Sequence, residues 1–205
     1  MSFDAFRRDV KIEVFDYQLI AGYFGDLKKI RDKVSSLVAE GKIVRLKKGL
    51  YVFGENWRRS PINLEVIANL LYGPSCISFE YALTRYGLIA ERSQVITSLA
   101  IGDTKVYQTP LGQFEYRAID RKKFKVGIEY RDLGNEGGYF IASREKAIAD
   151  LVYRTSGIRT MDQLRHYLFE EMRMDESMFR TIDFHKLNEI ANVYKKNSIY
   201  MLSKI

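Results

Sequence analysis

One short segment, GKIVRLKKGLYVF at residues 41–53, most constrains the fold of this chain. Residues 43–46 and 50–53 are rich in residue types that favour β-strands, and the sequence Lys47-Lys48-Gly49 separates them. Gly49 can take the positive φ that a tight turn requires, and Gly41 can end a preceding helix as a C′ glycine. The segment therefore predicts a two-stranded hairpin that directly follows a helix and carries positive charge at its turn.

Two helices are predicted before this hairpin. Apolar residues follow helical spacing over 14–24, where Asp16 can cap the start. A second helix follows Gly25, with Asp26 as its candidate N-cap. Its apolar residues recur every three or four positions and form one stripe: Leu27, Ile30, Val34, Leu37 and Val38. Helix, turn, helix and then a two-stranded ribbon is the order of elements in a winged helix-turn-helix domain.

In such a domain the second helix enters the major groove of DNA, and the wing lies beside the neighbouring phosphates. We therefore expect the groove to be contacted by Lys28, Lys29, Lys33 and Ser36. The expected phosphate contacts of the wing are Arg45, Lys47 and Lys48. Asp32 lies within the expected reading face, where it can repel phosphate, pair with a neighbouring cation or accept a hydrogen bond from cytosine.

Positive charge is concentrated in the first part of the chain. Residues 1–59 hold 13 Lys and Arg against 8 Asp and Glu, a net charge of +5, and residues 60–205 hold 20 against 18, or +2. A cluster of cations on one module favours binding to a polyanion such as DNA, because neutralising phosphates releases counterions. The alternative is a winged-helix fold that binds a partner protein and leaves its lysines solvated, because a fold alone does not fix function.

The polar segment 55–61 ends in a proline and is predicted to connect two domains, residues 1–59 and 60–205. The second domain begins with helices at 63–72 and 78–86, the latter with Ser78 as a cap. Strand-like segments follow at 94–101, 105–109, 112–119, 125–131 and 139–142. Helices are predicted again from Ser143, from the Thr160–Gln163 capping box over 161–172, and from Asp183. The pattern indicates an α+β domain with an antiparallel sheet and C-terminal helices.

The sequence offers little catalytic chemistry, so we expect neither catalytic residues, nor a metal, nor a cofactor. His166 and His185 are too far apart for a helical metal pair, although distant residues can converge in a fold. Ser143 and Lys146 match the Ser-x-x-Lys motif, but its companion motifs are absent and a serine at a helix start is usually a cap. Cys76 is expected to be a buried, unreactive thiol. We expect the protein not to be an enzyme.

The sequence favours a cytoplasmic protein that does not associate with membranes. Its longest apolar runs are far shorter than the ~20 residues needed to cross a bilayer, and the N-terminus has no apolar signal region. The single cysteine excludes an internal disulfide and fits a reducing compartment.

The chain resembles the AbiEi-type antitoxins of type IV toxin–antitoxin systems over nearly its whole length. In the first half the resemblance lies in LVAEGKIVRLKKGLY at 37–51. Lys48 stands where that family often has arginine, so the positive charge is kept but the planar guanidinium group, which can donate two parallel hydrogen bonds, is lost. In the second half it lies in SFEYAL at 78–83, YGLI at 86–89, TPLG at 109–112 and SREKAIADLV at 143–152. Each motif alone is weak, and their order is more specific.

This resemblance implies that the N-terminal domain binds double-stranded DNA in its own promoter and represses transcription. It further implies that the second domain neutralises a nucleotidyltransferase toxin without forming a stable complex with it. The alternative, a protein-interaction module for which DNA binding is incidental, stays open. The basic run 121–125 is interpreted as a solvated loop, with an additional DNA or RNA contact as the second interpretation.

Overall fold

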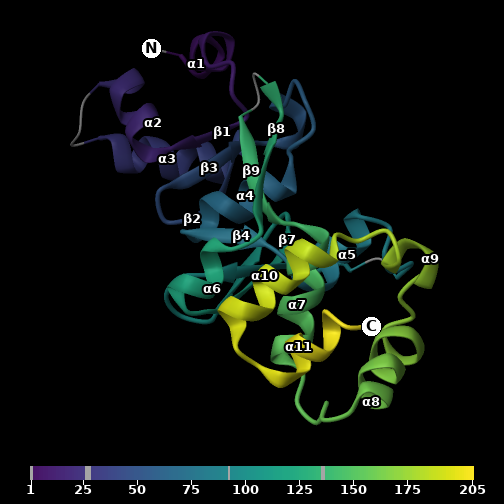
Figure 1. Cartoon of the computed structure of the whole chain (residues 1–205). Helices are drawn as coiled ribbons and strands as arrows, with labels where there is room; N and C mark the ends of the chain where they lie inside the picture. Colours follow the sequence, from purple (N-terminus) through teal and green to yellow (C-terminus); the bar gives the residue numbers. More distant parts are fainter. Residues whose placement is uncertain (1, 26–28, 92, 135–136) are drawn as a thin grey trace. The chain divides into compact units, whose positions relative to one another are not determined.

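The computed structural model describes residues 2–25, 29–91, 93–134 and 137–205. In these ranges it is an α+β protein with eleven α-helices, a three-stranded antiparallel sheet and a six-stranded mixed sheet (Figure 1). The chain divides into two compact units, which are described separately. Unit 1 comprises Met1–Ile67 and Gln108–Gly112, and unit 2 comprises Ala68–Tyr107 and Gln113–Ile205. Within the described ranges, no helix has the length and apolar character needed to cross a membrane.

Unit 1 alternates helices with the strands of the small sheet. Its elements are α1 (Phe3–Asp9), β1 (Val14–Asp16), α2 (Tyr17–Phe24), α3 (Ile30–Ala39), β2 (Ile43–Lys47), β3 (Leu50–Phe53) and the 3₁₀ turn η1 (Glu55–Trp57). Strand β3 lies in the centre of the sheet, in the order β1-β3-β2, and pairs antiparallel with both neighbours. The predicted hairpin is confirmed as β2 and β3.

Local sequence signals explain the ends of these elements. The carboxylate of Asp16 accepts a hydrogen bond from the amide of Leu19 and caps α2, as predicted. Gly41 has a φ of +67° and ends α3 in a Schellman motif, in which the Lys42 amide bonds to the Leu37 carbonyl. Gly49 has a φ of +87° at the turn between β2 and β3. Residues 14–16, at the start of the segment with helical spacing, were not predicted as a strand; they form β1 because they pair with β3.

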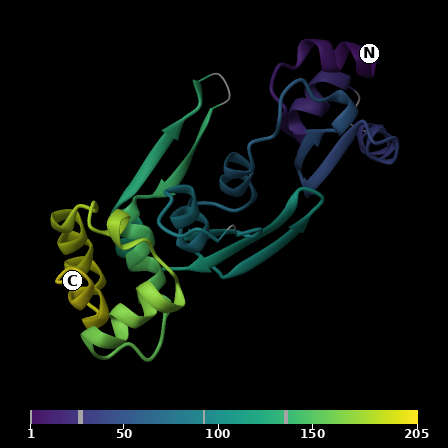
Figure 2. The same ribbon diagram turned by 90° about the vertical axis from the view of Figure 1, so that its right-hand side faces the viewer.

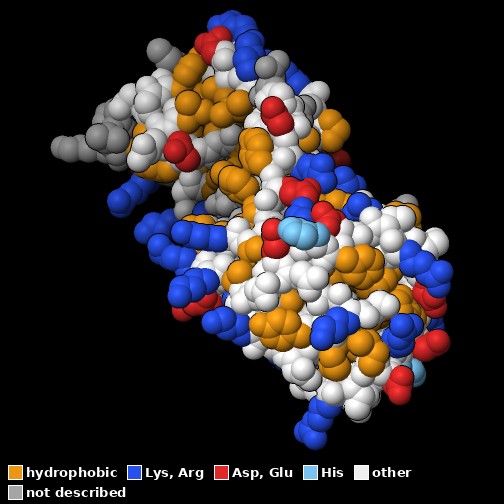
Figure 3. Space-filling model, viewed as in Figure 1, with side chains coloured by type: hydrophobic (Ala, Val, Ile, Leu, Met, Phe, Trp, Pro, Cys, Tyr) orange, Lys and Arg blue, Asp and Glu red, His pale blue; other side chains and the backbone are white. Residues whose placement is uncertain are grey.

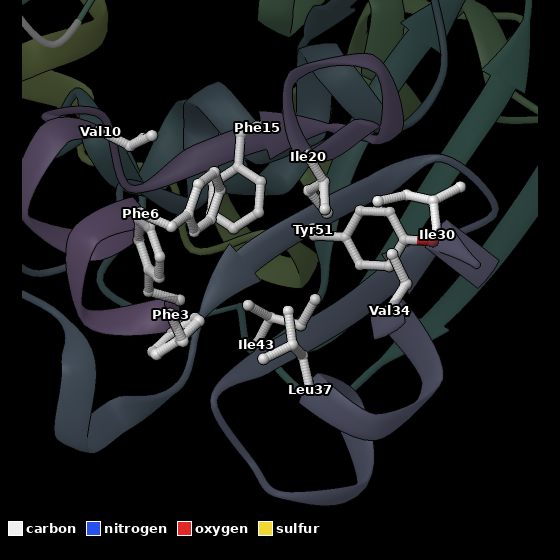
Figure 4. Packing of buried hydrophobic residues seen from close by; sticks show 11 residues of the cluster. Phe3, Phe6, Val10, Phe15, Ile20, Ile30, Val34, Leu37, Ile43 and Tyr51 are labelled. Atoms are coloured by element: carbon white, nitrogen blue, oxygen red, sulfur yellow. The ribbon is translucent and has the colours of Figure 1, made fainter. Parts of the chain in front are cut away.

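Aromatic and aliphatic side chains from every helix of unit 1 form one core (Figure 4). The expected stripe of α3 is confirmed at Ile30, Val34 and Leu37, all of which are buried. Helix α1, which was not predicted, adds Phe3 and Phe6. Because Phe6 packs on several other aromatic rings and is fully buried, α1 is an integral part of unit 1.

Unit 2 is organised around the six-stranded sheet, whose order is β6-β7-β5-β4-β9-β8. The strands are β4 (Ser75–Ile77), β5 (Ile96–Ala100), β6 (Lys105–Thr109), β7 (Gly112–Ala118), β8 (Ile128–Asp132) and β9 (Gly138–Ala142). The prediction of an antiparallel sheet is corrected here, because β5 pairs parallel with β7 and β4 pairs parallel with β9. Strand β4, which was not predicted, makes one of these pairs. Residues of β4 and β5 are all buried, as expected for the middle of a covered sheet.

The remaining helices are α4 (Leu64–Leu71), which begins in unit 1, and α5 (Phe79–Arg85), α6 (Arg121–Lys125), α7 (Arg144–Arg154), α8 (Met161–His166), η3 (Tyr167–Glu171), α9 (Glu176–Phe179), α10 (Phe184–Tyr194) and α11 (Asn197–Leu202). Helices α7, α10 and α11 pack together as a group (Figures 1 and 2). The predicted caps are confirmed at Ser143, Thr160 and Asp183. The expected helix 161–172 instead changes to a π-helical turn at η3.

Candidate nucleic-acid interface

The exposed side of α3 carries three of the four residues predicted to face the DNA groove. Lys29 and Ser36 are exposed and Lys33 is half-buried; Lys28 lies outside the described residues. The ammonium group of Lys33 lies 5.6 Å from the centroid of the Phe24 ring in α2, so its stem follows apolar surface while its charge reaches solvent. The structure therefore places two lysines on the solvent side of α3.

Ser36 makes a contact that the sequence did not predict. Its hydroxyl donates a short hydrogen bond to Oε1 of Glu40, and Oε2 of the same carboxylate pairs with Lys42 Nζ at 2.6 Å. The hydrogen bond from Lys42, followed by that from Ser36, lowers the pKa of Glu40. A carboxylate therefore stands beside the expected reading residue, where it repels phosphate and leaves the hydroxyl with acceptor capacity only.

The three predicted wing residues lie on β2 and at its turn. Arg45 is exposed and lies opposite Tyr51, whereas Lys48 is exposed in the turn itself. An irregularity in the register between Arg45 and Lys47 interrupts the alternation of the strand. Lys47 is half-buried, and burial lowers the pKa of its ammonium group. Arg45 and Lys48 are thus the more accessible of the three cations.

Unit 2 contains a buried polar cluster that sequence reasoning missed. Lys146 and Asp150 are fully buried on α7, with Lys146 Nζ 3.3 Å from Asp150 Oδ1. The ammonium group also donates to the hydroxyl of Tyr194 at 2.8 Å and to the carbonyl of Lys123 at 2.9 Å. Asp150 accepts further hydrogen bonds from the hydroxyls of Tyr194 and Ser78. These bonds satisfy the charges that burial would otherwise penalise.

This cluster corrects one prediction and refines another. Ser78 occupies the N-cap position of α5, but its side chain makes no capping bond and donates to Asp150 at 2.6 Å instead. In the Ser-x-x-Lys match, Ser143 accepts from the amide of Lys146 as a helix cap, and the Lys146 ammonium group faces Asp150. A lysine and an aspartate four residues apart inside an apolar helix, in KAIAD, were the signal that could have revealed the pair.

The remaining candidates for chemistry lie apart from one another. His166 and His185 are exposed at helix surfaces, with 65% and 85% of their side chains accessible. Cys76 is a buried free thiol, as predicted, and burial raises its pKa. Among the residues that the structure describes, no group of three or more His, Cys, Asp or Glu side chains is placed to hold a metal ion.

The fold thus defines an α+β protein in two units, and the exposed cations of α3 and the β2–β3 turn give unit 1 a candidate anion-binding face. No protein-family model matches the chain, and no curated protein matches it. Its fold is similar to that in the crystal structure of the RV2827C protein from Mycobacterium tuberculosis, with a TM-score of 0.57. The match covers 97% of this chain and 74% of that chain at 12% sequence identity, so the likeness concerns the fold.

Proposed function

We propose that unit 1 is a winged helix-turn-helix domain that binds double-stranded DNA, and that the chain is a transcriptional autorepressor and antitoxin of a type IV toxin–antitoxin system. The observation that carries the DNA-binding part is the order of elements, α1-β1-α2-α3-β2-β3, with strand order β1-β3-β2 and exposed cations on the last helix and the hairpin turn. The sequence resemblance supports the promoter as target and the antitoxin role.

The geometry of α3 suits a recognition helix. It has ten residues, which corresponds to about 15 Å, and its buried side rests on the core of unit 1 while Lys29, Lys33 and Ser36 remain at least partly accessible. A helix of this kind fits the major groove, where lysine can donate to guanine. Arg45 and Lys48 would then contact phosphates, which position the domain without reading sequence.

The antitoxin role belongs in this proposal to unit 2, with a nucleotidyltransferase toxin as its functional partner and without a stable complex. We propose no catalytic residue, metal or cofactor for the chain. This part rests on the motifs shared with the antitoxin family, at 78–83 and 143–152.

A second candidate function is supported by the Ser36–Glu40–Lys42 contact. The carboxylates of Asp32 and Glu40 lie on the same helix as the proposed reading residues and disfavour phosphate nearby. A surface of mixed charge is suited to a protein partner, so the second candidate is a protein-interaction module for which DNA binding is incidental.

A gel-shift titration tests the first candidate. The protein is titrated against its own upstream promoter fragment and against a scrambled fragment of equal length, at two salt concentrations. We expect a clear preference for the promoter. Equal, salt-sensitive binding to both fragments would leave a nonspecific polyanion surface, and absence of binding would favour the protein-interaction module.

Substitution of the wing lysines then assigns the site. If Lys47 and Lys48 each contact one phosphate, replacing both by alanine flattens the slope of log K against log salt by about 2 units and leaves sequence preference intact. The matched control replaces Arg8 and Lys11, which are exposed and lie outside β2, β3 and their turn; this replacement removes the same charge. Equal effects of the two double variants would mean that net charge alone, and not the wing, is responsible.

A further inference from the structure

Unit 2 contains a basic groove whose role is separate from that of unit 1. A cavity of about 470 Å³ is lined by Tyr153, Arg154, Tyr194, Lys195 and Lys196, at the C-terminal ends of α7 and α10. Its lining holds three cations and no carboxylate. In Figure 3 further Lys and Arg side chains, in blue, gather along the edge of unit 2 where α6 lies. Together, the cavity and the cations of α6 are called the basic groove.

The aromatic ring of Tyr153 connects α6 with the cavity. Lys123 Nζ and Lys196 Nζ lie 5.6 and 5.3 Å from the centroid of this ring. The solvated loop expected at 121–125 is therefore a helix, α6, and its residue Lys123 lies beside the Tyr153 ring that lines the cavity. Asp120 is the nearest acid in this segment, and its carboxylate is occupied as the N-cap of α6.

The buried cluster holds the groove in place. Lys146 Nζ donates both to the carbonyl of Lys123 in α6 and to the hydroxyl of Tyr194 in α10. One buried ammonium group therefore ties together the two helices from which Lys123 and Lys195 project. Such fixed positions lower the entropic cost of binding a ligand.

The cations of the groove differ in their hydrogen-bond partners and in their accessibility. Lys196 Nζ donates to three carbonyls, those of Val152, Tyr153 and Thr155, and so caps the end of α7. Arg154 and Lys195 are exposed, and among the described residues no carboxylate lies within salt-bridge distance of either. These two side chains, with Lys123, are available to an anion.

The backbone at Lys195 carries a second signal. This residue ends α10 in the left-handed conformation, with φ +52° and ψ +39°. Glycine is the residue that takes this position without a steric penalty. A lysine in this conformation lowers the stability of the fold, and here its charge lies in the groove. Strained residues of this kind often occur at binding sites.

We propose that the basic groove binds a run of phosphate groups, as presented by a nucleoside triphosphate or by single-stranded nucleic acid. Arg154 supplies the planar fork that matches phosphate oxygens, and Lys195 and Lys123 supply point charges on either side of Tyr153. The site lies within unit 2, so it is independent of duplex binding by unit 1.

The test measures binding of a fluorescein-labelled oligouridylate to the full chain by anisotropy, with ATP and inorganic phosphate as competitors. The variant combines Arg154→Gln with Lys195→Gly. We expect its affinity for the oligonucleotide to fall at least about tenfold and its salt slope to fall by about 1.4 units, because two phosphate contacts are lost. Its melting temperature should equal or exceed that of the wild type, since glycine relieves the left-handed residue.

A matched control combines Arg159→Gln with Lys204→Gln, which removes the same charge from exposed positions of unit 2 outside the groove. The control and the Lys47→Ala, Lys48→Ala variant should bind the oligonucleotide like the wild type. Lys123→Gln is a second test that leaves the helix end unchanged, and it should weaken binding on its own.

Competition distinguishes the two sources of phosphate. Displacement of the oligonucleotide by ATP assigns a site of nucleotide size, whereas displacement only by unlabelled oligonucleotide assigns a longer strand; both support the proposal. Absence of binding by either probe would overturn it. So would binding that the groove variants leave unchanged.

Discussion

Among the described residues, each unit buries one Lys or Arg side chain, Arg7 in unit 1 and Lys146 in unit 2, and the two are accommodated in different ways. In unit 1 the guanidinium of Arg7 donates to the carbonyls of Trp57 and Val10 and pairs with Glu13 at 2.6 Å, while it stacks 4.0 Å above the ring of Phe53. In unit 2 the ammonium of Lys146 is enclosed completely and meets Asp150. Both cations therefore pair with a carboxylate; Arg7 adds two backbone carbonyls and an aromatic ring, whereas Lys146 adds one backbone carbonyl and the hydroxyl of Tyr194.

The difference follows from the chemistry of the two side chains. A planar guanidinium can reach several carbonyls at once and lie on an aromatic ring, so Arg7 joins α1, η1 and β3 at the edge of the unit 1 core. An ammonium group is a strongly hydrated point charge and needs a counter-charge when all water is removed. We therefore expect unit 2 to respond more strongly than unit 1 to the loss of a single partner.

The largest expected effect is that of Asp150→Ala. It leaves the buried ammonium of Lys146 without its counter-charge and should lower the free energy of unfolding by about 3–5 kcal/mol. Urea titration followed by far-UV circular dichroism measures this. The double variant Lys146→Met, Asp150→Leu removes both charges and should recover most of the loss. If the single variant were no less stable than the double variant, the ion pair would not be the basis of the difference.

Arg7→Lys is expected to have an intermediate effect in unit 1. A lysine keeps the charge but cannot reproduce the fork that reaches Trp57 and Val10, so unfolding should become easier by about 1–3 kcal/mol. The sole tryptophan of the sequence, Trp57, reports on this unit by fluorescence. Arg8→Lys, at a side chain that is 73% exposed, serves as control and should change stability by less than about 0.5 kcal/mol. Equal changes in the free energy of unfolding for Arg7→Lys and Arg8→Lys would show that the guanidinium geometry of Arg7 does not stabilise unit 1.

The smallest expected effect concerns an exposed carboxylate. Hydrogen bonds from the amides of Lys186 and His185 lower the pKa of Asp183 below its value in the unfolded chain. Its contribution to stability is therefore present above the unfolded pKa and is lost as the pH falls through the folded pKa. Asp183→Asn keeps an acceptor at the cap but does not titrate, so the variant should lose less stability than the wild type on acidification.

Urea midpoints at neutral and acidic pH measure this third effect. Asp183→Ala is the control, because it lacks the cap at every pH and should be weakened already at neutral pH. An acid-induced loss in Asp183→Asn as large as that of the wild type would assign the acid sensitivity to other carboxyl groups.

Much of the local structure could be predicted from the amino-acid sequence. The caps at Asp16, Ser143 and Asp183 and the turn at Gly49 follow from residues within one helical turn or one hairpin. The apolar stripe of α3 follows from periodicity, since only one side of a surface helix can face a core. Of the proposed DNA contacts, accessibility was predictable at Lys29, because polar residues opposite an apolar stripe face solvent, and at Lys48, because a hairpin turn lies at the surface.

Other features depended on partners distant in sequence. Strand β1 exists because residues 14–16 pair with β3, and a segment of three residues carries no period that could reveal this. Parallel pairing in the six-stranded sheet joins strands whose order no local signal specifies. Ser78 looks like a helix cap in the sequence, yet its hydroxyl turns to Asp150, 72 residues further along the chain.

The sequence by itself determined the helix ends, the hairpin and the concentration of positive charge in residues 1–59, because these depend on neighbouring residues or on composition. Only the tertiary structure decided that Lys146 is buried, that Glu40 holds Ser36, and that α6 lies beside Tyr153 to complete a basic groove. The physical reason is that burial and ion pairing are set by which surfaces pack together, and the strand order that brings those surfaces together is a property of the whole chain.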